Sequence, residues 1–110
     1  MQAIDRIHEL LESNPVVAFV RGNVAQPMCS GSEALLQALE QCDVFFLAVD
    51  VQADPELRAF LPRVSNRTSF PQLFVEGEFI GGADVAVELH TQGDLAPLCN
   101  DAINRLRKSA

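Results

Sequence analysis

The chain has 110 residues, of which 48% are hydrophobic and 21% charged, and this composition predicts one compact domain over residues 1–110. Its formal net charge of −7 at pH 7 argues against binding to nucleic acid or to an anionic membrane surface. No apolar run approaches the roughly 20 residues of a membrane span, and residues 1–6 lack the basic start and apolar core of a secretory signal.

The first half of the chain predicts a helix, a strand and a second helix. Apolar residues recur at helical spacing over residues 4–11, and Asn14-Pro15 ends this helix. Residues 16–20 are a short continuous apolar run, which is typical of a strand covered on both faces. After a loop over residues 21–28, a helix is predicted over residues 29–41.

The second half begins with another apolar run, over residues 44–50, which predicts a second buried strand. Asp54 can cap a short helix, since Pro55 is tolerated at a first helical position, and this helix ends near Leu61-Pro62. The remaining predicted elements are a β-hairpin with strands over residues 73–75 and 79–80, and two helices over residues 84–92 and 95–108.

This order of elements predicts one mixed sheet with helices on both faces. A crossover helix links the first two strands, so they are predicted to be parallel with a right-handed connection. The hairpin then adds antiparallel strands.

One cysteine, Cys29, lies at the junction of the first strand and the second helix. Free backbone N–H groups and the positive end of the helix dipole favour a thiolate there. Ser32 stands where a second thiol would complete a two-cysteine redox motif, so Cys29 needs a thiol from outside the chain. Cys42 and Cys99 are interpreted as structural residues, and His8 and His90 are assigned no catalytic role.

The number and spacing of the cysteines also bear on the compartment and on metal binding. Three widely spaced cysteines fit a reducing cytoplasm better than a disulfide scaffold. No two cysteines or histidines have the spacing of zinc ligands, which argues against a zinc site.

Several motifs follow one another along the chain in a recognisable order. They are Asn14-Pro15, Arg21-Gly22, Pro27-x-Cys29-x-x-Ser32, Asp54-Pro55-x-Leu57-Arg58, Asn66 to Pro71 with Gln72, Gly77-Glu78-Phe79-Ile80-Gly81-Gly82, and Asp84. From Ile4 to about Leu106 the chain resembles the monothiol glutaredoxins. The resemblance implies a thioredoxin-like α/β fold, with a four-stranded mixed β-sheet flanked by about five helices.

The resemblance also implies a glutathione site around Cys29 as the catalytic thiol. The Phe70-Pro71 bond is expected to be cis, with the Phe70-Pro71 backbone beside the cysteinyl unit of glutathione. Arg21 and Arg58 are expected to hold glutathione carboxylates, and Asp84 to meet the γ-glutamyl group. The full set implied for glutathione binding is Arg21, Arg58, Phe70, Pro71, Gly82, Ala83 and Asp84.

In the family, the active-site cysteine can also be the metal ligand of a [2Fe-2S] cluster, held with two glutathiones between the subunits of a homodimer. Here that ligand is Cys29, but the signature Cys-Gly-Phe-Ser is replaced by Cys29-Ser30-Gly31-Ser32. Gly31 is expected to loosen the first helical turn. The family's Trp-Pro-Thr is replaced by Arg67-Thr68-Ser69, which is expected to remove a rigid loop and to add positive charge.

Three functions therefore remain open. The first is a glutathione-dependent monothiol glutaredoxin that binds and transfers a [2Fe-2S] cluster through Cys29 as a homodimer. The second is an enzyme, a glutathione-dependent thiol-disulfide oxidoreductase that removes glutathione from protein mixed disulfides. The third is a glutaredoxin fold that binds glutathione or a protein partner without catalysis.

Overall fold

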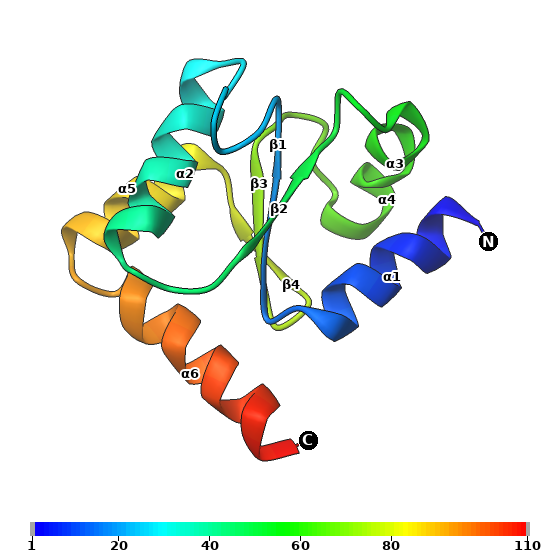
Figure 1. The fold of residues 1–110 in the computed structure, drawn as a ribbon. Coiled ribbons are helices and arrows are strands. Elements are labelled where there is room, and N and C mark those ends of the chain that lie inside the picture. The colour runs from blue at the N-terminus through cyan, green and yellow to red at the C-terminus, as the bar shows by residue number, and fades with distance from the viewer. Residues whose placement is uncertain (1, 110) are drawn as a thin grey trace.

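A computed structural model describes residues 2–109 and has ten elements of secondary structure (Figure 1). In chain order they are α1 (Ala3–Ser13), β1 (Val16–Val20), α2 (Ser30–Gln41), β2 (Leu47–Asp50), α3 (Pro55–Phe60), α4 (Pro62–Ser65), β3 (Gln72–Val75), β4 (Glu78–Gly81), α5 (Ala83–Thr91) and α6 (Leu95–Ser109). No helix within this described part is long and apolar enough to cross a membrane.

The four strands form one sheet in the order β2-β1-β3-β4. β1 pairs with β2 in parallel, as the crossover helix predicts, and with β3 in antiparallel orientation. β3 and β4 form the predicted hairpin. Its turn residues Glu76 and Gly77 both have positive φ, as a tight two-residue hairpin turn requires.

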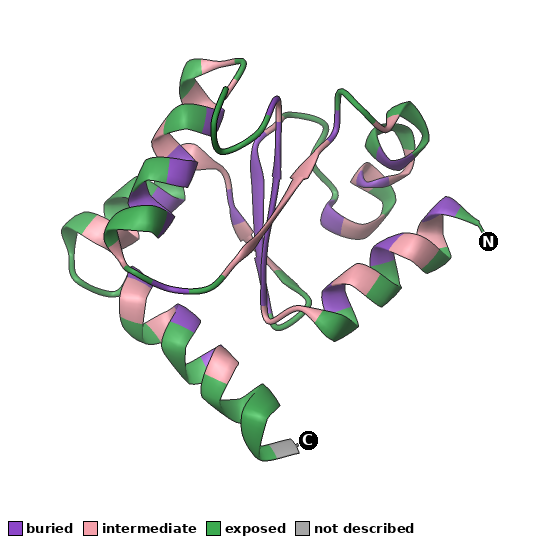
Figure 2. Ribbon diagram, in the orientation of Figure 1, coloured by how far each residue is buried: buried purple, intermediate pink, exposed green. Residues whose placement is uncertain are grey.

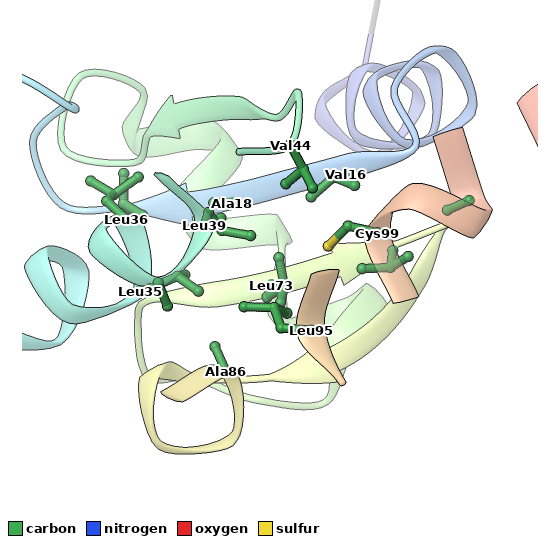
Figure 3. Packing of buried hydrophobic residues seen from close by; sticks show 14 residues of the cluster. Val16, Ala18, Leu35, Leu36, Leu39, Val44, Leu73, Ala86, Leu95 and Cys99 are labelled. Atoms are coloured by element: carbon green, nitrogen blue, oxygen red, sulfur yellow. The ribbon is translucent and has the colours of Figure 1, made fainter. Parts of the chain in front are cut away.

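Alternate residues of β1 face two separate cores, because successive side chains of a strand point to opposite faces. Val17 and Phe19 pack with α1 and α3, whereas Val16, Ala18 and Val20 pack with α2, α5 and α6. The strand is therefore buried along its whole length between two helical layers (Figure 2). Figure 3 shows the second core, where side chains of β1, β3, α2 and α6 meet.

One prediction about the elements is wrong. The second strand covers Leu47–Asp50 instead of residues 44–50, and its residues are half-buried instead of buried. As an edge strand, β2 has a neighbour on one side only, and Phe45 just before it is 79% exposed. The prediction of a four-stranded mixed sheet flanked by about five helices is confirmed, and Pro62 starts the additional single turn α4 directly after α3.

Candidate active site

The loop that connects β1 with α2 is held closed by hydrogen bonds, and it leads to Cys29 at the edge of the sheet where the carboxyl end of β1 lies. Gly22 forms an isolated antiparallel bridge with Pro27, and the Met28 N–H donates to the Arg21 carbonyl at 2.9 Å. Gly22 has a φ of +87°, and a Cβ on it would lie 2.3 Å from the Gln26 carbonyl oxygen. Only glycine fits this position without strain, so the loop conformation depends on Gly22.

Cys29 is the N-cap residue of α2, as predicted. Its backbone is extended, and its Sγ accepts a hydrogen bond from the Ser32 N–H at 3.4 Å. The Ser32 Oγ lies 3.1 Å from the same sulfur. A cysteine in this position takes the place of the usual capping oxygen, which directs its sulfur at the free N–H groups of the first turn.

Ser32 does more than replace a second cysteine. It is fully buried, and its Oγ accepts a hydrogen bond from the Arg21 N–H at 2.9 Å. In the thiol form the Cys29 S–H donates to this hydroxyl as well, and once the thiol ionises the hydroxyl can donate its own proton to the sulfur. Ser32 therefore connects the end of β1 with the Cys29 sulfur, a role that sequence reasoning missed.

The electrostatic environment lowers the pKa of the Cys29 thiol. Partial burial on its own raises this pKa, but the hydroxyl and the N–H of Ser32 lower it, with further lowering by the Arg21 guanidinium and the Gly31 N–H. The combined hydrogen bonds and positive charge outweigh the burial. The site therefore favours the nucleophilic thiolate form.

Pro71 lies beside the first turn of α2. The Phe70-Pro71 peptide bond is cis, as the resemblance implies. A Cβ built on Gly31 would lie 3.1 Å from the Pro71 Cδ, and one built on Gly82 would lie 3.4 Å from the Pro71 carbonyl oxygen. The structure therefore brings the cysteine helix, the Phe70-Pro71 segment and the start of α5 together, although these segments are far apart in the sequence.

The loop before Pro71 is anchored by a buried side chain. The Gln72 Nε2 donates to the Arg67 carbonyl at 2.9 Å and to the Ser69 carbonyl at 3.0 Å. Gln72 is 1% exposed, so a buried donor holds the backbone of two exposed residues. Hydrogen bonds from Gln72 thus hold the segment that replaces the family's Trp-Pro-Thr. No sequence pattern had indicated these contacts.

We expect the Gln72→Leu variant to unfold with a free energy about 1–2 kcal/mol lower than the parent, because two carbonyls lose their protein donor. Urea denaturation followed by circular dichroism measures this difference. The Gln37→Leu variant is the control, since Gln37 is exposed on α2, and it should differ from the parent by less than about 0.5 kcal/mol. Equal unfolding free energies for Gln72→Leu and the parent would contradict the anchoring role.

Ala83 and Asp84 lie in the first turn of α5, next to the cysteine helix. They line a surface pocket of about 490 Å³ between α2 and α5, together with Ser30 and Gly31. Gly31, which stands where the family signature has a phenylalanine, is one of the residues that line the pocket. The exposed Asp84 carboxylate gives it a negative group.

The two predicted arginines differ in their surroundings. Arg21 directly follows β1, and its buried Nε has no hydrogen-bond partner among the described residues. Arg58 lies in the last turn of α3, exposed and without an ion pair within residues 2–109. α2 and α3 both follow the carboxyl ends of parallel strands, so they begin at the same edge of the sheet (Figure 1).

Among residues 2–109, no group of three or more His, Cys, Asp or Glu side chains is placed to hold a metal ion. Cys29 has Ser32, not a thiol, as its hydrogen-bonding neighbour, and Cys42 lies after the opposite end of α2. Cys99 is buried in the core under α6. The site thus offers a single thiol group, that of Cys29.

A model of the glutaredoxin family matches residues 16–80 of this chain. The chain belongs to the glutaredoxin family. Glutaredoxin 4 of Haemophilus ducreyi is 36% identical over 105 residues, which are 96% of this chain and 98% of that protein. A probable monothiol glutaredoxin of Legionella pneumophila, GrlA, is 41% identical over 77% of this chain and 96% of its own length.

The fold of this glutaredoxin also matches solved structures. A buckwheat glutaredoxin crystallised with glutathione superimposes with a TM-score of 0.79 over 91% of this chain and 89% of that chain, at 22% identity. The mixed four-stranded sheet with helices on both faces is the thioredoxin-like fold that the resemblance implies. Within it, this monothiol glutaredoxin carries Cys29 at the start of α2.

Proposed function

We propose that this glutaredoxin binds glutathione beside Cys29, and that the thiolate and glutathione together hold and transfer a [2Fe-2S] cluster between two copies of the chain. The observation that carries the proposal is the single cysteine at the α2 N-terminus, whose thiol has a pKa lowered by hydrogen bonds from Ser32 and by the Arg21 guanidinium. A thiolate ligates iron, and a thiolate without a neighbouring thiol has no internal disulfide that would remove it.

The charges around Cys29 suit glutathione, which carries two carboxylates and one ammonium group. The buried Arg21 Nε lacks a partner, and a ligand carboxylate would supply its missing acceptor. Asp84 offers a carboxylate for the ammonium group, and Arg58 is a further cation at the same edge of the sheet. We assign the backbone of Phe70-Pro71 and the Gly82-Ala83 turn to the peptide part of glutathione. The buckwheat relative was crystallised with glutathione on the same fold.

The number of ligands supports a homodimer. Clusters of this type are held by four thiolates, whereas the described part of one chain offers one thiolate in the site and no group of three metal ligands. Two chains with two glutathiones supply four. The altered signature leaves the donors to the sulfur in place, because Ser32 bonds it directly and Ser30 is exposed.

The test is anaerobic reconstitution with iron, sulfide and glutathione, followed by visible absorbance and solution mass. The parent protein should gain charge-transfer bands and shift to a dimer, and omission of glutathione should prevent both changes. The Cys29→Ala variant should remain colourless and monomeric. The Cys42→Ala variant, which removes a thiol outside the site, should behave as the parent does.

Cluster absorbance retained by Cys29→Ala would contradict the proposed ligand. A colourless parent monomer would contradict cluster binding itself and favour the second candidate, a thiol-disulfide oxidoreductase. In that reaction the Cys29 thiolate attacks the glutathione sulfur of a mixed disulfide, the protein thiolate leaves, and a second glutathione resolves the new disulfide. The lowered pKa of the Cys29 thiol supports this route as well.

We place either activity in the cytoplasm, where glutathione keeps thiols reduced.

Turnover of a glutathione mixed disulfide measures the second candidate directly. Stabilisation by glutathione without cluster or turnover would leave the third function, a binding module.

A further inference from the structure

A second cysteine forms a hydrogen-bonded group with a histidine at the opposite end of α2. Cys42 follows α2, and His90 lies in the last turn of α5, which packs against α2. The Cys42 Sγ lies 3.4 Å from the His90 Nδ1, and the His90 Nε2 lies 2.8 Å from the Gln41 Oε1. The sequence alone had assigned Cys42 a structural role and His90 none.

The Gln41 contact determines which nitrogen of His90 faces the sulfur as an acceptor. The Gln41 Oε1 is a carbonyl oxygen and can only accept, so the His90 Nε2 carries the hydrogen. In the neutral ring, Nδ1 then has a free lone pair, and the Cys42 S–H donates to it. Hydrogen bonds thus connect a nucleophile with a base, and the base with a group that orients it, as in activated thiols of enzymes.

The other cysteine in this region lacks these features. Cys99 is fully buried, and its burial raises the pKa of the thiol to about 12. Cys42 is half-buried at the surface end of the helix. Burial raises the pKa of the Cys42 thiol too, so at neutral pH it depends on a base to become a nucleophile.

We propose that Cys42 is a second exchange site, which takes up a glutathionyl group from glutathione disulfide with His90 as the base. His90 Nδ1 removes the thiol proton, and the Cys42 Sγ attacks one sulfur of the disulfide. The S–S bond of the reagent breaks, and the second glutathione leaves as a thiolate that recovers the proton. Cys42 sulfur is oxidised to a mixed disulfide and the leaving sulfur is reduced.

The proposal does not involve Cys29 and goes beyond the cluster and exchange functions proposed above. A glutathionyl group on Cys42 would place a charged tripeptide where α2 and α5 end.

The experiment treats the Cys29→Ser protein with glutathione disulfide and follows each cysteine by peptide mass spectrometry. Cys42 should be modified, while Cys99 in the same sample should stay free. The His90→Gln variant keeps a polar side chain without a basic nitrogen, and its Cys42 should react about tenfold more slowly. Gln41→Leu, a change of an exposed side chain that orients the base, should also slow the reaction.

Equal rates of Cys42 modification in the Cys29→Ser protein with and without His90→Gln would overturn the proposal, as would modification of Cys99 as fast as Cys42. Thermal unfolding of each variant shows whether the fold is kept. If His90→Gln unfolds the protein and exposes Cys99, the Gln41→Leu variant is the test that remains. An unchanged rate of Cys42 modification in Gln41→Leu would overturn the proposal. Loss of cluster binding or of turnover at Cys29 leaves this outcome unaffected, because the measurement uses protein without that thiol.

Discussion

We expect the Ser32→Ala variant to keep its fold and to lose much of its Cys29 thiolate at neutral pH. Ser32 provides the only side-chain hydrogen bond to the Cys29 sulfur among the described residues, and removing its hydroxyl raises the pKa of the thiol. A hydrogen bond to a charged group contributes about 1.5–3 kcal/mol, so the thiolate population falls by about tenfold or more at a pH below the pKa.

The pH dependence of Cys29 alkylation by iodoacetamide measures this effect. The midpoint should move to higher pH in Ser32→Ala, since the thiolate then needs a lower proton concentration to form. Ser30→Ala is a matched control, because Ser30 lies in the same helical turn but is exposed, and its side chain makes no hydrogen bond within the described residues. An unchanged midpoint in Ser32→Ala would show that the helix N–H groups and Arg21 are enough to lower the pKa of the Cys29 thiol.

The Gly22→Ala variant should be the most destabilised of the loop variants, with the free energy of unfolding lowered by about 2–4 kcal/mol. Two costs combine at this position. The φ of +87° is unfavourable for a residue with a Cβ, and that Cβ would lie 2.3 Å from the Gln26 carbonyl oxygen and 2.7 Å from the Met28 Cγ. Relief of the contact requires movement of the segment that leads directly to Cys29.

The Gly93→Ala variant separates the two costs. Gly93 has a φ of +79°, but a Cβ there meets nothing within 4 Å, so this change should lower stability by only about 1 kcal/mol. Chemical denaturation of both variants gives the two values. Equal losses would mean that the contact with Gln26 adds nothing, and normal alkylation of Cys29 in folded Gly22→Ala would mean that the loop moves without disturbing the site.

Much of the fold could be predicted from local patterns. The first strand and its flanking helices are marked by apolar periodicity, and the Asp54 cap, the hairpin turn and the N-terminal position of Cys29 follow from residue chemistry. The length and burial of β2 could not be predicted in this way. Val44–Val49 is an apolar run, and this pattern does not tell whether the strand lies in the centre of the sheet or at its edge. Sheet order is a property of the tertiary structure.

The position of Cys29 in the candidate site could be predicted from the sequence, whereas most of the contacts that support it could not. Cys29 and Pro71 were identified from motifs, whereas the Ser32 contact with the Arg21 N–H and the Gln72 anchor were not. These hydrogen bonds join side chains to the backbone of segments brought together only by folding. The Cys42–His90 contact spans 48 positions, and no spacing rule relates residues that far apart.

The position of β1 has a consequence for the motions that can reach the site. β1 has a strand on each side and a helical layer on each face, so opening it requires near-global unfolding of the domain. Arg21, whose N–H holds Ser32, directly follows this strand. Fraying at the ends of α1 or α6 therefore leaves the base of the Cys29 site unmoved, and the geometry around the thiolate persists for as long as the domain stays folded.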